Sequence, residues 1–199
     1  MDAVSQSCRN RDLVSFLNMK SGMKSGSVLL QLLGGTKSSQ SLRRWINLWP
    51  PFLGAGVRVQ RISADLKSVD VEMKLRWWNA NYVGTHFGGS LFAMTDAFYM
   101  LMLMANLGRD YIVWDKAATI RYKKPGRGTV RAEFRLSESQ IEDIREKLKT
   151  LPKYEPVFLV EVKDESGTVI AEVEKLLHVR KKDLSAGQPQ SGERMQPTA

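Results

Sequence analysis

The stretch FGGSLFAMTDAFYMLMLMANLG (Phe87–Gly108) decides how this chain folds. Its length and composition predict one helix over residues 87–107, in which Asp96 is the only residue charged at neutral pH. Because nearly every face of that helix is apolar, it must be covered on all sides. A carboxylate inside such a cover has to be neutralised, hydrogen-bonded or used in chemistry. Asp96 is therefore the first candidate functional residue.

Strand patterns lie on both sides of this helix. The expected strands are Val57–Val59, Val69–Arg76, Tyr111–Tyr122, Val130–Leu136, Phe158–Val162 and Val169–Val173, most of them with apolar residues at every second position. Short turns at 65–68 and 164–167 join neighbouring strands as hairpins, which predicts a mostly antiparallel sheet of the α+β class. Such a sheet covers only one side of the central helix, so we expect a second subunit on the other side.

Helix signals are found outside the sheet. Leu42, Trp45, Ile46 and Trp49 form one apolar stripe that Pro50 should end, and a shorter helix is expected over 28–33. Ser137 begins a further helix, with Gln140 placed for a capping box. We expect a flexible leader over 1–26, one domain over 27–180 and a disordered tail over 181–199.

Composition narrows the function class. The 199 residues carry a net charge of +9, spread along the chain, and a solvated basic surface is the simplest interpretation. No arginine-rich arm, zinc-ligand spacing or helix-turn-helix pattern indicates nucleic-acid binding. The single cysteine, Cys8, excludes an intrachain disulfide and indicates a reducing, cytoplasmic location. Only 90–108 approaches membrane-spanning length, and Thr95, Asp96 and Asn106 within it argue against a span.

The motif around Asp96 resembles that of a known superfamily. Asn81-x-x-Gly84-x-x-x-Gly88-Gly89, followed by six residues and Asp96, is similar to the pattern of hotdog-fold acyl-CoA thioesterases. Other segments look closer to a hotdog subgroup known only as a domain of unknown function: 49–59, 84–104 and 111–118. The resemblance implies a curved, mostly antiparallel sheet wrapped around one long central helix. It also implies a homodimer or dimer of dimers, with an acyl-thioester pocket at the subunit interface.

The resemblance assigns roles that the chemistry of thioester hydrolysis makes reasonable. Gly88 and Gly89 at a helix start would donate backbone N–H groups to the oxyanion. Asp96 would be the general base or nucleophile, with a pKa raised by burial. Asn81 would orient the water or hold the acyl carbonyl. One departure is that Phe87 occupies the superfamily's histidine position and His86 lies one residue earlier.

Substrate-binding candidates complete the predicted site. Gly84 and His86 belong to the same loop as the motif, while Lys123, Lys124 and Arg127 surround a Pro-Gly turn and could meet the phosphates of coenzyme A. The resemblance implies no metal and no redox cofactor.

Geometry connects the site to the dimer. Gly89 and Asp96 lie on almost the same helix face but about 10 Å apart along the axis, too far for one thioester carbon to contact both. Two antiparallel helices across a dimer would bring the glycines of one subunit to the acid of the other.

Three alternative functions remain: a non-catalytic acyl-CoA or fatty-acyl binding protein, a hydratase-type lyase using His86 with Asp96, and a purely structural role. Asp115 and Lys116 inside an apolar strand are expected to form an ion pair at an interface.

Overall fold

The computed structural model describes residues 39–182, in which six strands form one antiparallel sheet of order β1-β2-β4-β5-β6-β3. The strands are β1 (Val57–Ile62), β2 (Ser68–Lys74), β3 (Tyr111–Tyr122), β4 (Thr129–Arg135), β5 (Val157–Asp164) and β6 (Val169–Lys181). The helices are α3 (Ser39–Asn47), α4 (Pro50–Ala55), α5 (Gly88–Ala93), α6 (Phe98–Leu107) and α7 (Glu138–Thr150). All six expected strands are present. The leader over 1–26, the helix over 28–33 and the tail beyond residue 182 lie outside the described residues.

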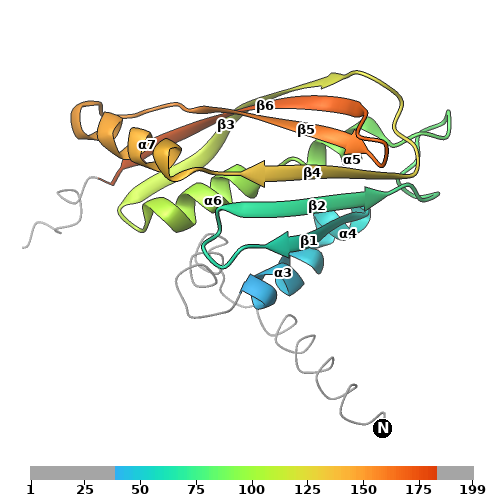
Figure 1. The fold of residues 1–199 in the computed structure, drawn as a ribbon, viewed down its shortest axis with the longest axis horizontal. Helices are drawn as coiled ribbons and strands as arrows, with labels where there is room; N and C mark the ends of the chain where they lie inside the picture. Colours follow the sequence, from blue (N-terminus) through green and yellow to red (C-terminus); the bar gives the residue numbers. More distant parts are fainter. Residues whose placement is uncertain (1–38, 183–199) are drawn as a thin grey trace, which may run out of the picture.

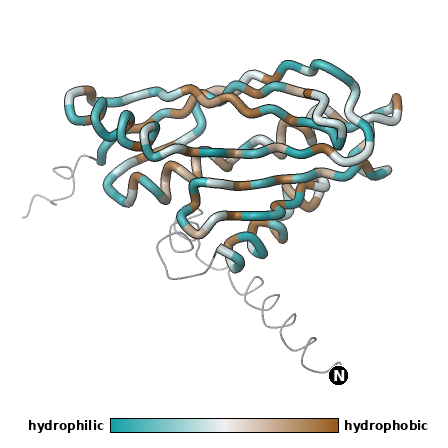
Figure 2. The backbone as a smooth tube through the Cα atoms, viewed as in Figure 1, coloured by the Kyte–Doolittle hydropathy of each residue, from teal (hydrophilic) through white to brown (hydrophobic). Residues whose placement is uncertain are grey.

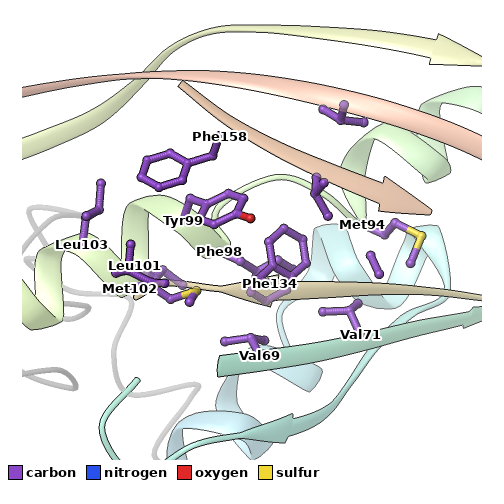
Figure 3. Close-up of a cluster of buried hydrophobic side chains, with 14 of the residues drawn as sticks. Val69, Val71, Met94, Phe98, Tyr99, Leu101, Met102, Leu103, Phe134 and Phe158 are labelled. Carbon is purple, nitrogen blue, oxygen red and sulfur yellow. The ribbon is translucent and has the colours of Figure 1, made fainter. Parts of the chain in front are cut away.

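The core lies between one face of the curved sheet and the central helix (Figure 1). Inward-facing apolar residues alternate with outward-facing polar ones along the strands, which Figure 2 shows as alternating colours. Phe98 and Tyr99 of α6 pack against Phe134 and Phe158 of the sheet, with ring centroids 4.8 Å apart for Phe98 and Phe134 and 4.4 Å apart for Tyr99 and Phe158 (Figure 3). Burying one such side chain stabilises the fold by about 1.5–3 kcal/mol, so this cluster fixes the helix on the sheet.

The central helix is present but interrupted, where we expected it to be continuous. Ala97 has φ 64 and ψ −32, and the Phe98 N–H donates to the Asp96 carbonyl at 2.8 Å. This is a γ-turn, a rare and strained conformation for a residue with a side chain. The Thr95 hydroxyl contributes to the break because it donates to the Phe92 carbonyl at 2.8 Å, an acceptor that a continuing helix would use for a backbone N–H. The kink falls at the single acid of the helix.

The segment Gly88–Leu107 is long and apolar enough to cross a membrane, the only one that passes this test within residues 39–182. However, 56% of its most apolar stretch is buried inside the protein. It is the core helix of the fold.

Of the expected helix ends, the start at Ser137 is confirmed, whereas the prolines after α3 have a second role that we did not expect. The capping box at Ser137 is confirmed, since its hydroxyl accepts from the Gln140 N–H and the Gln140 side chain returns to the Ser137 N–H. The prolines after α3 do end that helix, but they also begin α4, which we did not predict. Proline suits the first turn of a helix because the N–H it lacks would have no partner there.

Candidate functional site

The loop between β2 and α5 is organised by Asn81. Its side-chain Oδ1 accepts from the N–H groups of Val83 at 3.1 Å and Thr85 at 3.0 Å, and its Nδ2 donates to the Thr85 hydroxyl at 2.8 Å. Gly84 completes the turn with a positive φ of 73. Both ends of the Asn81 amide are therefore engaged inside the loop, which makes this residue a determinant of the loop's shape.

His86 follows in the same loop and is buried, with 3% of its surface exposed. Its Nε2 lies 3.2 Å from the Gly128 carbonyl, so it must donate there and leave Nδ1 as an acceptor. That Nδ1 is buried without a hydrogen-bond partner. Burial lowers the pKa of His86, and the Gly128 carbonyl offsets only part of this effect. The imidazole is neutral near pH 7.

A buried neutral histidine should make the fold less stable in mild acid. The unfolded chain takes up a proton near the ordinary pKa of about 6.5, whereas folded His86 resists protonation until a lower pH. The free energy of unfolding should therefore fall as the pH drops below about 6.5. Urea titrations of the wild-type protein and His86→Gln at several pH values measure this effect. The free energy of unfolding of the variant should depend less steeply on pH than that of the wild type. The other histidine, His178, is common to both proteins, so equal slopes would contradict the prediction.

Gly88 and Gly89 form the first turn of α5, and no residue within 39–182 accepts a hydrogen bond from either N–H. A Cβ on Gly88 would lie 2.8 Å from the Tyr122 hydroxyl, which donates to the Gly88 carbonyl at 3.0 Å. A Cβ on Gly89 would lie 2.4 Å from the ring of Phe87. Both positions are therefore crowded by aromatic side chains, and two donors are left available to a ligand.

These elements surround a pocket of about 510 Å³ at the start of α5. Its lining includes six of the nine predicted site residues: Asn81, His86, Gly88, Lys123, Lys124 and Arg127. The remaining three, Gly84, Gly89 and Asp96, do not line it. The structure thus brings together the loop before α5 and the basic turn after β3, which are more than thirty residues apart in sequence.

The cations of this pocket differ in availability. Lys123 Nζ is 2.9 Å from a carboxylate oxygen of Glu172. Lys124 and Arg127 form no ion pair within the described part of the chain and leave their charge to a ligand. A larger hollow of about 730 Å³ opens between β4 and β5 on the outer sheet face, but it contains none of the predicted residues.

Asp96 lies at the break between α5 and α6, away from this pocket. Lys175 Nζ donates to its Oδ1 at 2.8 Å, while Oδ2 has no hydrogen-bond partner within residues 39–182. The Lys175 side chain is 2% exposed and the Asp96 side chain 48% exposed. The burial that we expected for the Asp96 side chain is therefore not found within residues 39–182. The acid is instead held in an ion pair at the surface of the core.

A second carboxylate shares the same lysine. Asp115 of β3 lies 3.1 Å from Lys175 Nζ. Burial raises the pKa of Asp115, and the charge of Asp96 adds to the rise while Lys175 opposes it. The ion pair that we expected between Asp115 and Lys116 is not formed, because a bulge lies between Asp115 and Ala117 and Lys116 pairs with Glu155 at 2.7 Å.

Sequence reasoning missed two residues of the site. Lys175 occupies an inward position of β6, in line with Val173 and Leu177, and this alternation is visible in the sequence once β6 is known to extend beyond Val173. Tyr122 joins the pocket through its hydroxyl, and its position at the end of a strand gave no signal of that contact.

The curved six-stranded antiparallel sheet around a central helix is the hotdog fold, and solved structures agree. A protein of unknown function from Pseudomonas aeruginosa, PA5026, described as a "probable thioesterase", has a TM-score of 0.65 and 22% identity over 73% of this chain and 97% of that one. Thioesterase HI1161 from Haemophilus influenzae has a TM-score of 0.54 and 13% identity over 74% of this chain and 93% of that one.

The chain belongs to the family described as a domain of unknown function (DUF4442), whose model matches residues 39–179. This agrees with the resemblance to an uncharacterised hotdog subgroup. No curated protein matches the chain significantly.

Proposed function

We propose that this protein is a cytoplasmic acyl-CoA thioesterase that hydrolyses an acyl thioester in a pocket at the interface of a homodimer. The observation that carries the proposal is that Gly88, whose N–H is free, lines one pocket together with Lys124 and Arg127, while the free N–H of Gly89 lies next to it in the same helical turn. Donors for an oxyanion and cations for phosphates are the two features that an acyl-CoA requires. The descriptions of PA5026 and HI1161 name the same reaction class.

The free edge of the sheet supports a dimer. β3, which is twelve residues long, ends the strand order, and within residues 39–182 its only partner strand is β6. A long unpaired edge is a ready site for pairing with a second strand. The adjoining side of the central helix is only partly covered, at Phe92, Ala93, Asp96, Ala97, Met100 and Met104. Pairing of two β3 strands would cover both features and turn Asp96 toward the other subunit.

The chemistry follows from this arrangement. The thioester carbonyl oxygen accepts hydrogen bonds from the N–H groups of Gly88 and Gly89, which favours the tetrahedral intermediate. Oδ2 of Asp96 of the partner subunit takes a proton from water, whose oxygen attacks the carbonyl carbon. The C–S bond then breaks, and the departing thiolate recovers that proton. Lys175 holds Oδ1 and leaves Oδ2 free for this task.

One alternative has an observation in its favour. Phe87 replaces the superfamily's histidine, and its half-exposed ring lies against Gly89. An apolar ring at this position can contact an acyl chain whether or not the ligand is hydrolysed. A non-catalytic acyl-CoA binding protein is therefore the second candidate. The hydratase-type lyase is disfavoured, because His86 bonds to Gly128 and Asp96 to Lys175 rather than to each other.

The test is free-thiol release from short-, medium-, long-chain and aromatic acyl-CoAs. The proposal expects turnover of at least one class. Saturable binding of acyl-CoA without turnover of any substrate would contradict the thioesterase proposal and favour the non-catalytic binding protein.

A further inference from the structure

The loop between β2 and α5, residues 75–87 and here named the aromatic loop, exposes large apolar side chains. Trp77 is 87% exposed, Tyr82 fully exposed and Val83 75% exposed, and Trp78 and Phe87 are each about half exposed. In Figure 1 this part of the chain lies at the end of the sheet opposite α7. Exposed apolar side chains that cluster in this way mark a surface for interaction.

The aromatic loop is held open by buried polar groups. Asn79, which is 1% exposed, accepts from the Arg76 N–H at 2.7 Å and donates to the carbonyls of Lys74 at 3.1 Å and Ala55 at 3.2 Å. Together with the hydrogen bonds of Asn81, these contacts fix the backbone. The aromatic side chains are therefore presented to the surroundings by a built scaffold.

The two chain segments that form and flank the aromatic loop carry bases and no acids. Residues 73–95 contain two bases and no acid, and residues 121–128 contain four bases and no acid. The two segments are neighbours, since the Leu75 N–H donates to the Gly128 carbonyl at 2.8 Å. Lys123 is neutralised by Glu172. The other five bases, Lys74, Arg76, Arg121, Lys124 and Arg127, form no ion pair in the part of the chain that the structure describes.

We infer that the aromatic loop docks this protein on the surface of an anionic phospholipid bilayer. Trp and Tyr favour the membrane–water interface, where an apolar ring and a polar group are both accommodated. Unpaired Lys and Arg beside them attract anionic headgroups. A second copy of the chain fits less well, because a symmetric contact through the loop would bring together two surfaces of the same positive sign.

Docking has a consequence for the pocket. Asn81 and Val83 of the aromatic loop line it, together with the basic turn. The bilayer would therefore lie beside the pocket entrance, where an amphiphilic ligand can pass from one to the other. The docking itself does not depend on the reaction proposed above.

The experiment measures binding of the full chain to vesicles of phosphatidylcholine, with and without phosphatidylserine, by co-sedimentation. We expect binding to the anionic vesicles that added salt reverses. Trp77→Ser/Tyr82→Ser should weaken it by about tenfold or more, and Lys74→Gln/Arg76→Gln should weaken it and reduce its salt dependence. Leu159→Ser is the matched control, because Leu159 is 58% exposed on the outer sheet face. It should bind as the wild type does.

Three outcomes would overturn the inference. The first is no binding of the wild-type chain to anionic vesicles. The second is equal binding by wild type and Trp77→Ser/Tyr82→Ser, which would assign binding to other basic segments. The third is an equal loss in the Leu159→Ser control. Analytical ultracentrifugation of the loop variant adds a separate readout: a monomer in place of a dimer, with no vesicle binding by the wild type, would make the aromatic loop a subunit contact.

Discussion

Replacing Asp96 by Asn is expected to lower kcat for acyl-CoA hydrolysis by about 10²–10⁴-fold, because the amide cannot take a proton from water. The fold should survive, since Lys175 keeps Asp115 as a partner at 3.1 Å and the Asp96 side chain is already 48% exposed. The measurement is thiol release at saturating substrate, with circular dichroism to verify the fold.

Asp115→Asn is the matched control for that experiment. It removes a carboxylate from the same lysine but leaves the contact between Lys175 and Asp96 in place. We expect kcat to change only a few-fold in this variant, on the order of 1 kcal/mol or less in barrier height. A folded Asp96→Asn protein with wild-type turnover would exclude Asp96 as the base.

Replacing Lys175 by Met is expected to lower the free energy of unfolding by about 2 kcal/mol at pH 7. The substitution leaves the partly buried Asp115 beside Asp96 without a cation. Removing one partner of a fully buried ion pair costs more, but here the exposed Asp96 remains hydrated and the buried ammonium no longer has to be desolvated. Urea unfolding of both proteins measures the difference.

The pH dependence gives this prediction a second readout. Burial already raises the pKa of Asp115, and removing Lys175 should raise it further above its value in the unfolded chain. Protonation of Asp115 then favours the folded state. The difference in the free energy of unfolding between the wild type and Lys175→Met should therefore shrink as the pH is lowered from neutral. Lys153→Met breaks an exposed pair with Glu155 and should cost less than about 0.5 kcal/mol. Equal costs for the two variants, or a deficit independent of pH, would contradict the account.

The strand pattern was predictable because burial on one face of a sheet imposes a period of two that the sequence must carry. β3 was predicted with the bounds that the structure has, Tyr111–Tyr122. The capping box at Ser137 was equally readable, because it depends on residues three positions apart. The kink at Ala97 was not, since nothing in an apolar run of helix formers indicates a γ-turn.

The residues of the candidate site also divide into those that local motifs identify and those that only long-range contacts bring together. Asn81, Gly88 and the basic turn were identified from local motifs, and they lie around one pocket. Lys175 was missed because its partner Asp96 is 79 residues away and only the pairing of strands brings them together. The environment of Asp96 was misjudged for a related reason: the sequence predicts an apolar cover on all sides, but residues 39–182 leave the Asp96 side chain 48% exposed. The second subunit remains a prediction.

The most direct test of the account is subunit complementation, because it asks whether Asp96 acts at the pocket of the other subunit. Asp96→Asn should be inactive for lack of a base, and Gly88→Val should be inactive because a side chain there would meet the Tyr122 hydroxyl beside the N–H donors. The two variants, differently tagged, are co-expressed and thiol release is measured on the mixture. A shared interface site predicts recovery of about a quarter of wild-type activity, since half the dimers are mixed and each has one intact site. Two folded variants that form mixed dimers yet recover no activity would contradict the shared site.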